Sequence, residues 1–480
     1  MAFLQRTMNR GSVSTGYEIE NSLKLESDNS EYLDNRHHSA GNRRTWTLSF
    51  WIKRTELGTT QKPYDSGNVA SIGFLSSDKI QIENTTLYLA TDRVFRDTSA
   101  WYHIVLLNDS TQSTASNRAK LWINGVQETS FYSETYMPQN QDGNINSATS
   151  VSIGGGGGAH VNGYMAELFF VDGQALAPTD FGEFDEDSGI WIPKEYGGTL
   201  SGTSIKLDFS NSSALWEDSS GLSGNGTAMS GNNITSADQA TDTPTNNFCT
   251  LFPPPDAVTG TEPSVKEGGT TMFGGVSSTQ NAFGTMGVRS GKWYFESTIT
   301  DDGGVATNNH NFGVIDPEQI TYVMTSGRDI GASPAGWACA SNSLPRNNNA
   351  SASGANGTGS LAENEIMGVA IDMDNGKIWW HRQGTWTSIN STVGNPANGT
   401  TPAFSNLLTA TDNFVIPAGG FYVNDGNQTR VMNFGGYAQA VFTAVGTYTD
   451  ANGYGSFAYQ PPSGYYALCG KNLAEFGGTA

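Results

Sequence analysis

Short segments in which hydrophobic and polar residues alternate recur along the first part of the chain, separated by polar or glycine-containing turns. In residues 45–53, for example, Trp46, Leu48, Phe50 and Ile52 fall on one face of an extended strand. Further strands are predicted within residues 22–33, 101–107, 119–126, 151–153 and 163–171. Strands at this spacing, without helical patterns between them, predict a sandwich of two antiparallel sheets.

A second group of strands begins near Ser264. Strands are predicted at residues 291–299, 311–315, 365–373, 377–381, 413–423 and 429–434. Asn375-Gly376 in this group, like Asn124-Gly125 in the first, predicts a tight hairpin turn. Residues 331–360, rich in Asn, Ser, Ala and Gly, are expected to form a long loop. A second sandwich is therefore expected.

Residues 180–256 separate the two groups and are rich in carboxylates, with Pro253 to Pro255 at their end. The segments 205–209 and Trp216 are expected to pack on the first sandwich. The predicted organisation is an N-terminal arm (1–21), a first sandwich (22–200), an acidic, proline-containing connector (201–256) and a second sandwich (257–480). The fold class is all-β, with two tandem antiparallel sandwiches.

Composition and charge exclude several classes of function. The chain has 480 residues, enough for two or three domains, and its 11% aromatic residues argue against disorder. The net charge of -21 disfavours a nucleic-acid partner. No signal-peptide pattern and no run of about 20 apolar residues is visible, so we expect cytoplasmic synthesis without membrane insertion. Cys249, Cys339 and Cys469 are widely spaced and are interpreted as reduced thiols.

Each of the two groups of strands resembles a known family. Strings at residues 22–33, 46–53, 101–105, 119–127 and 163–167 resemble, in order, the laminin-G-like branch of the concanavalin A-like sandwiches. Strings at residues 291–295, 368–380, 431–435 and 461–468 resemble a SPRY domain. These resemblances imply that both sandwiches are concanavalin A-like jelly rolls.

Residues 39–53, 206–221 and 242–250 also resemble tailed-bacteriophage virion proteins of the tail-fibre type. This resemblance implies a structural, lectin-like virion component that is made in the host cytoplasm and recognises a host-surface polysaccharide or receptor. Other virion proteins and further copies of the chain, with a homotrimer favoured, are the implied partners. The alternative is an architectural virion protein, a capsid decoration or a fibre adaptor, that binds other virion proteins.

An enzymatic role has one candidate motif. Hydrolases with this kind of sandwich carry Glu-x-Asp-x-Glu or Glu-x-Asp-x-x-Glu, because two carboxylates must flank one glycosidic bond. The nearest approach here is Glu183-Phe184-Asp185-Glu186, whose second glutamate comes one place too early and which lies between glycines. We interpret it as an acidic loop and expect no catalytic residues; a polysaccharide depolymerase is the third alternative.

An aromatic cluster gives the candidate ligand-binding residues Trp379, His381 and Trp386. Alternation places Ile378 and Trp380 in the core and the candidates Trp379 and His381 on the other face of the strand. Exposed aromatic rings can stack on the apolar faces of sugars, which makes these residues the candidates for ligand binding. The alternative is that these rings cover the sheet or a subunit interface.

Two further motifs bear on cofactors. The resemblance to laminin-G-like domains allows a calcium ion at loop carboxylates, with no ligand assignable, and no other cofactor is expected. Asp372 to Gly376 lacks the closing glutamate of a calcium loop and is interpreted as a β-turn. Gly154 to Gly158, followed by His160, is not followed by the residues of a phosphate loop and predicts a flexible turn at a strand end.

Overall fold

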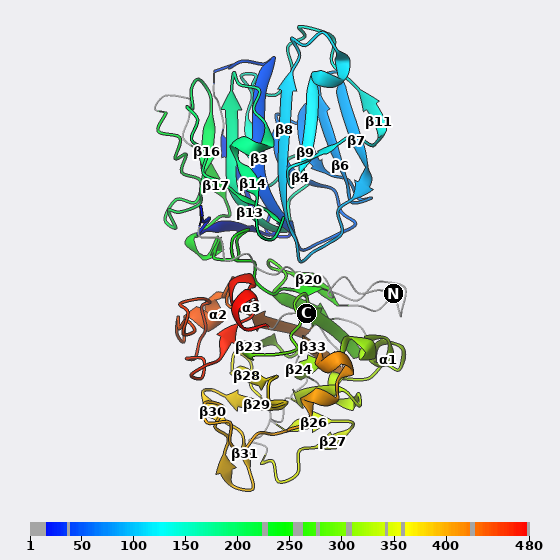
Figure 1. Ribbon diagram of the computed structural model, residues 1–480, viewed down its shortest axis with the longest axis vertical. Helices are drawn as coiled ribbons and strands as arrows, with labels where there is room; N and C mark the ends of the chain where they lie inside the picture. Colours follow the sequence, from blue (N-terminus) through cyan, green and yellow to red (C-terminus); the bar gives the residue numbers. More distant parts are fainter. Residues whose placement is uncertain are drawn as a thin grey trace. The chain divides into compact units, whose positions relative to one another are not determined.

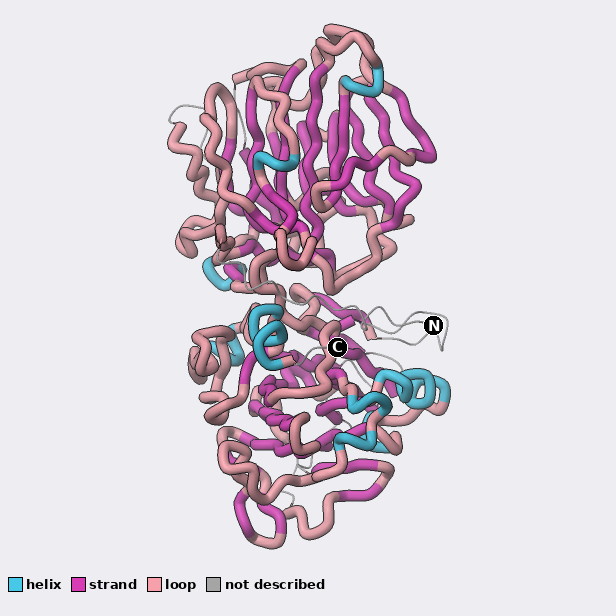
Figure 2. The backbone as a smooth tube through the Cα atoms, viewed as in Figure 1, coloured by secondary structure: helices cyan, strands magenta, loops and turns pink. Residues whose placement is uncertain are grey.

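The computed structural model describes residues 16–35, 39–222, 229–252, 263–274, 279–303, 310–340, 344–356, 361–422 and 428–477. These residues form an all-β protein whose α-helices are the short α1 (Ile320–Thr325), α2 (Ala440–Thr443) and α3 (Gly470–Phe476), with several 3-10 turns in both units (Figure 2). The described chain divides between Asn247 and Phe248 into an N-terminal unit and a C-terminal unit. Each unit is a sandwich of two sheets whose strands are almost all antiparallel (Figure 1).

The N-terminal unit contains sheets 1 and 2. Sheet 1 has the order β10-β9-β8-β3-β13-β1-β18, with β16 beside β13, and sheet 2 has the order β11-β7-β6-β5-β4-β12-β2-β17. The strands of sheet 1 are β10 (Val126–Glu128), β9 (Ala119–Ile123), β8 (Trp101–Asp109), β3 (Thr45–Arg54), β13 (Gly163–Asp172), β1 (Ser22–Leu25), β18 (Gln239–Ala240) and β16 (Ile205–Leu207). Those of sheet 2 are β11 (Phe131–Thr135), β7 (Leu87–Val94), β6 (Lys79–Asn84), β5 (Ala70–Phe74), β4 (Gln61–Ser66), β12 (Val151–Ile153), β2 (Tyr32–Asn35) and β17 (Ser230–Asn232). A separate hairpin joins β14 (Gly182–Phe184) to β15 (Trp191–Pro193).

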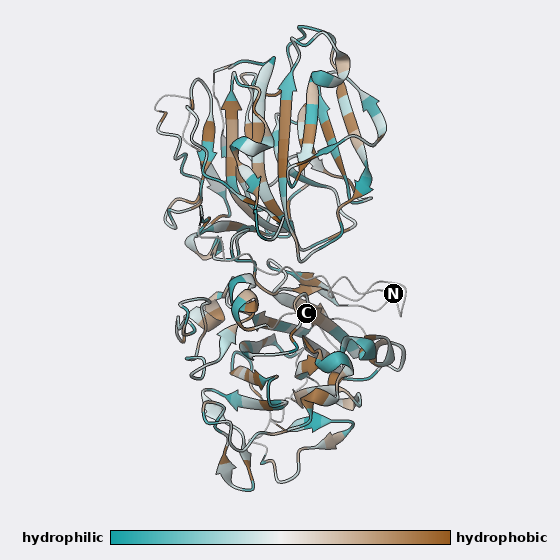
Figure 3. Ribbon diagram, viewed as in Figure 1, coloured by the Kyte–Doolittle hydropathy of each residue, from teal (hydrophilic) through white to brown (hydrophobic). Residues whose placement is uncertain are grey.

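The core of this unit lies between its two sheets, as alternation predicts. Leu48, Phe50 and Ile52 of β3 are fully buried and belong to the same cluster as Ile72 and Ile82 of sheet 2. Brown and teal bands alternate along the strands in Figure 3, where apolar and polar residues follow each other. The burial of one face of each sheet stabilises the sandwich.

The C-terminal unit contains sheets 3 and 4. Sheet 3 has the order β19-β22-β33-β24-β25-β26-β27, and sheet 4 has the order β20-β21-β34-β23-β28-β29-β30, with β35 beside β23. The strands of sheet 3 are β19 (Leu251–Phe252), β22 (Thr279–Gly284), β33 (Ile416–Tyr422), β24 (His310–Ile315), β25 (Gly336–Ala340), β26 (Pro345–Asn347) and β27 (Ala350–Ser351). Those of sheet 4 are β20 (Ser264–Lys266), β21 (Thr271–Gly274), β34 (Gln428–Asn433), β23 (Lys292–Asp301), β28 (Ile366–Asp372), β29 (Lys377–Arg382), β30 (Thr385–Trp386) and β35 (Tyr466–Ala467). A small hairpin joins β31 (Ser388–Ile389) to β32 (Thr392–Val393).

Residues 205–209 and Trp216 pack on the N-terminal sandwich, as predicted, but the expected connector, residues 201–256, belongs to that sandwich to a greater extent than predicted. β16, β17 and β18 pair with β13, β2 and β1, so this segment supplies strands to both sheets of the N-terminal unit. Beyond the division, β19 already pairs with β22 of the C-terminal unit. The carboxylates and prolines of this segment are typical of a linker. Short edge strands need few apolar residues, so the hydrophobic pattern did not reveal them. Pro253 to Pro255 and most of the expected arm 1–21 lie outside the described residues.

The expected loop at 331–360 is a second correction. Gly336 to Ala340 forms β25, a fully buried strand that pairs with β24, and β26 continues the sheet. Small residues around Trp337 concealed this strand, because Ala and Gly give little hydrophobic signal. The two predicted Asn-Gly hairpins are confirmed, since Asn124 and Gly125 both have positive φ and β28 pairs with β29 across Asn375-Gly376.

Cys249, Cys339 and Cys469 are all buried in the C-terminal unit and form no disulfide. Among the helices that the structure describes, none has the length and apolar character needed to cross a bilayer.

Candidate functional site

In the described residues, three of the four sheets have an outer face that carries a buried apolar cluster. On sheet 1, Phe181 packs against Phe169 of β13. On sheet 3, Ile320 of α1 belongs to a cluster with β24 and β33. On sheet 4, Tyr465 packs edge-on against Trp379 of β29. The outer face of sheet 2 differs, because polar side chains cross it from one edge strand to the other.

These polar side chains form one row, which we name the polar row. Consecutive members lie directly opposite each other in the strand register, so they share a face. The polar row consists of Ser230, Asp34, Ser152, Asp65, Ser71, Glu83, Tyr88 and Thr135, one from each strand of sheet 2. Their neighbours along the strands, such as Ile72, Ile82 and Leu89, are buried in the core.

One end of this surface carries two tyrosine rings, of which Tyr132 is exposed and Tyr88 is half-buried. Tyr132 of β11 is 51% exposed, and Lys79 Nζ lies 4.3 Å from its ring centre. Tyr88 of β7 donates a hydrogen bond to Gln81 Oε1 at 3.3 Å. A hydrogen bond with Tyr132 and burial raise the pKa of Tyr88. We name Lys79, Gln81, Glu83, Tyr88 and Tyr132 the tyrosine face.

The other part of the polar row is covered by the glycine run that the sequence predicted as a turn. Gly156 lies so close to Asp65 that a Cβ atom on it would be 2.4 Å from the Asp65 Cβ, and Gly157 and Gly158 have positive φ. Asp65 is thereby 2% exposed and accepts hydrogen bonds from Lys62 Nζ and Asn68 N. Only glycine permits this close approach, so the glycine run covers the polar row at Asp65.

Sheet 1 brings a serine and a histidine together under the hairpin β14–β15. His103 is fully buried, and Trp191 Nε1 donates to its Nδ1 at 2.9 Å. Nδ1 is therefore the unprotonated nitrogen, and Nε2 donates to Ser49 Oγ at 2.8 Å. Burial lowers the pKa of His103 to about 3. The ring lies in a stack with Trp51 and Trp191, so this pair holds the hairpin in place rather than activating Ser49.

The three predicted ligand-binding residues differ in how deeply the structure buries them. Trp379 is 1% exposed and donates its Nε1–H to the Thr400 carbonyl, and His381 is 2% exposed. Trp386 is half-buried and packs edge-on against His381. The outer face of β29 is thus covered by the chain itself, so Trp379 and His381 do not face a ligand, and the alternative that these rings cover the sheet is confirmed.

A chain of hydrogen bonds occupies the space around His381. Gly384 N–H donates to His381 Nδ1, so Nε2 carries the proton and donates to Tyr294 Oη at 2.7 Å. Tyr294 donates in turn to Glu296 Oε1 at 2.9 Å. Glu296 also accepts the backbone N–H groups of Ala458 and Tyr459. These bonds attach the segment around Ala458 and Tyr459 to sheet 4, which explains why the aromatic cluster is covered.

The acidic motifs of the sequence lie on turns. Glu183 is an exposed residue of β14 whose nearest cation is Lys194 Nζ at 3.8 Å, and Asp185 accepts hydrogen bonds from Ser188 in the hairpin turn. Asp372 likewise accepts from Asn375 N at 3.0 Å, so the predicted β-turn is confirmed.

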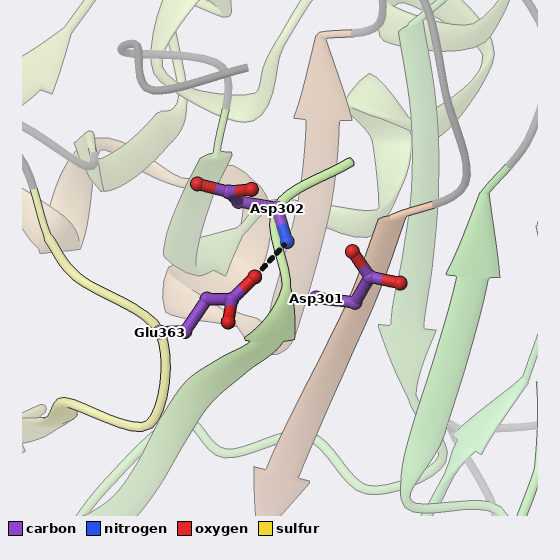
Figure 4. Close-up of side chains that lie close together, drawn as sticks. All are labelled: Asp301, Asp302 and Glu363. Carbon is purple, nitrogen blue, oxygen red and sulfur yellow. Dashed lines mark hydrogen bonds between the residues drawn. The ribbon is translucent and has the colours of Figure 1, made fainter. Parts of the chain in front are cut away.

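Three carboxylates of the C-terminal unit lie close enough together to hold a metal ion. One oxygen each of Asp301, Asp302 and Glu363 falls within 4.8 Å of the others (Figure 4). The backbone N–H of Asp302 donates to Glu363 Oε1 at 3.1 Å, which holds this arrangement without an ion. Two of the three residues are exposed, and such oxygen ligands suit calcium. The cluster could therefore hold a calcium ion, but it lies in the C-terminal unit and not in the unit that resembles laminin-G-like domains.

Residues 27–180 match the family model of the concanavalin A-like lectin/glucanases superfamily. The N-terminal unit contains a concanavalin A-like domain. Sheet 2, apart from β17, lies within the matched residues, so the tyrosine face is part of this domain.

Among the curated proteins, none matches the chain. Solved structures that it is similar to include the SPRY domain of human HERC1, at 14% identity and a TM-score of 0.27, covering 35% of this chain and 91% of that one. A candidate carbohydrate binding protein from Bacteroides ovatus has 14% identity and a TM-score of 0.30, covering 45% of this chain and 58% of that one. A heptameric SAP-like pentraxin from Limulus polyphemus has 17% identity and a TM-score of 0.25, covering 34% and 80%.

Proposed function

We propose that this protein binds carbohydrate through the tyrosine face of sheet 2. The observation that carries the proposal is an exposed aromatic ring, Tyr132, beside Tyr88 and three long polar side chains on a rigid sheet. Aromatic faces provide an apolar surface for the C–H groups of a sugar, while Lys79, Gln81 and Glu83 offer donors and acceptors for its hydroxyl groups. The position of this face in a concanavalin A-like lectin/glucanase domain supports the proposal.

The setting we propose is the particle of a tailed bacteriophage, where the chain serves as a lectin-like component that recognises a host-surface polysaccharide or receptor. The strings at residues 39–53, 206–221 and 242–250 support this setting by their resemblance to virion proteins. Several copies in one particle, with a homotrimer favoured, would raise avidity without tighter single sites. No catalytic step belongs to this proposal.

The test is binding of the labelled full chain to a panel of bacterial cells, with soluble surface polysaccharide as competitor. We expect saturable binding to a narrow set of strains, which the polysaccharide abolishes. Tyr132→Ala and Tyr88→Ala should each weaken binding about tenfold, because each removes part of the stacking surface. Tyr322→Ala, which removes a 40% exposed tyrosine of the C-terminal unit, is the matched control and should leave binding unchanged.

Two results would overturn parts of the proposal. Saturable binding that both variants retain would show that carbohydrate binds elsewhere on the chain. Absence of binding to any strain, together with capture of phage structural proteins, would favour the architectural alternative. A chelator arm in the same assay tests calcium: loss of binding with chelator, and in Glu363→Gln, would assign a role to the carboxylate cluster.

A further inference from the structure

Among the described residues of the C-terminal unit, one charged side chain lies in the interior without a counter-charge. Arg430 of β34 is 1% exposed, and its side chain points between the sheets, because Gly419 of the facing sheet would carry a Cβ 3.1 Å from Arg430 Cδ. Its hydrogen bond is to Ser297 Oγ at 2.7 Å, and its Nε has no partner. No carboxylate in the described chain lies within ion-pair distance of Arg430. An unpaired buried charge costs several kcal/mol, so this position needs an explanation.

Two further buried side chains beside Arg430 also lack partners. Gln428, two residues before it on the same face of β34, is fully buried with both Nε2 and Oε1 unbonded. His310 of β24 on the facing sheet is 2% exposed with both ring nitrogens unbonded. Burial, and next the charge of Arg430, lower the pKa of His310, so it is neutral and offers one N–H. Buried polar groups in native proteins are almost always satisfied, so three such groups together indicate an occupant.

The surroundings define what this occupant can be. Phe312 lies 5.5 Å from the Arg430 guanidinium, and Phe421 packs edge-on against His310, so the walls are apolar. Cys339 is not the counter-ion, because burial raises the pKa of its thiol and its Sγ donates to the Ala340 carbonyl. Packed sheets are about 10 Å apart, so an occupant between them beside these side chains must be small.

We propose that Arg430, His310 and Gln428 bind one small anion, chloride or a small carboxylate, inside the C-terminal sandwich. The three side chains present N–H donors and one positive charge, and the apolar walls exclude the water that would compete with an anion. The bound anion neutralises Arg430 and stabilises the unit. This site is independent of the tyrosine face, so its failure would leave the proposed carbohydrate binding untouched.

The test measures the urea midpoint of the C-terminal unit in the full chain at constant ionic strength. Thiol labelling of the three buried cysteines reports this unit alone, because all three lie in it. Chloride or formate should raise the midpoint with increasing concentration relative to gluconate, which is too large to enter. The chloride and formate arms show which small anion is preferred.

Variants separate the site from general salt effects. Arg430→Met should abolish the response to both anions and, in gluconate, should be at least as stable as the wild type, since it removes an unpaired buried charge. Arg346→Met is the matched control: it breaks an ion pair with Asp329 in the same unit and should keep the anion response.

A midpoint that is the same in chloride, formate and gluconate would overturn the proposal and leave bound water as the partner of these groups. If Arg430→Met does not fold, Gln428→Met and an anomalous diffraction search in wild-type crystals grown with bromide give the answer. A bromide peak beside Arg430 supports the site, and crystals without one refute it.

Discussion

Glu167 makes the stability of the N-terminal unit depend on pH. It lies on β13, where the pairing with β3 shifts register, and it has a positive φ of 42° and an exposed fraction of 3%. Tyr17 donates a hydrogen bond to its Oε1. Burial raises its pKa to about 7 from an ordinary value of 4.5, although the Tyr17 hydrogen bond and Lys206 act in the opposite direction.

The sign of the effect follows from proton binding. Between pH 4.5 and about 7 the folded chain holds a proton on Glu167 that the unfolded chain has lost. The contribution of Glu167 to the stability of the unit is therefore greatest below pH 4.5, and it is lost as the pH rises to about 7. The gap between the two pKa values corresponds to about 3 kcal/mol. Glu167→Gln keeps an acceptor for Tyr17 and removes the titration.

The assay is pulse proteolysis in urea over this pH range, with cleavage products assigned to each unit by mass spectrometry. The difference in unfolding free energy between the wild type and Glu167→Gln should change by about 3 kcal/mol from the acidic to the neutral end. Glu183→Gln, an exposed residue of the same unit, is the control and should follow the wild type. A pH-independent difference between the wild type and Glu167→Gln would refute the assignment of a raised pKa.

Two further predictions concern tryptophans. Trp379→Ala should lower the unfolding free energy of the C-terminal unit by about 3–5 kcal/mol, and Trp386→Ala should lower it by much less, because only Trp379 is fully buried. Thiol labelling in urea measures the unfolding free energy of both variants. Equal losses in the two variants would contradict the packing described. Trp191→Ala removes the ring that contacts His103, so limited proteolysis should cleave the hairpin β14–β15 much faster than in the wild type. Unchanged cleavage would mean that other contacts hold the hairpin.

The strands of the core could be predicted from the sequence because their signals are local. Residues 45–53 and 163–171 correspond to β3 and β13 within a residue or so, and residues 377–381 lie within β29. Strand pairing over long sequence separations has no such signal. The packing of residues 205–209, which contain β16, was predicted. The partners of β17 and β18 lie more than a hundred residues away in the sequence, and the sequence therefore suggested a connector there.

The tyrosine face was not among the predicted sites, although a signal for it exists. Residues 79–83 alternate strictly between polar and apolar side chains, with Ile80 and Ile82 in the core and Lys79, Gln81 and Glu83 outside. β4, β5, β6 and β7 were not assigned individually, so the shared register of Glu83 and Tyr88 could not be seen. A candidate site that depends on several strands becomes visible only when their pairing is known.

The same alternation explains why the aromatic candidates were misplaced. Alternation tells which side chains share a face, but not whether the chain covers that face. Strands with a covered outer face carry large side chains on both sides, as Trp379 and Trp380 do in β29 and Leu168 and Phe169 do in β13. Strands of sheet 2 carry short or polar side chains outside instead, as β6 does. Consecutive large apolar residues in one strand therefore indicate packing on both faces, whereas alternation alone leaves the polar face undecided: Thr47 and Ser49 of β3 alternate with core residues and are nevertheless buried.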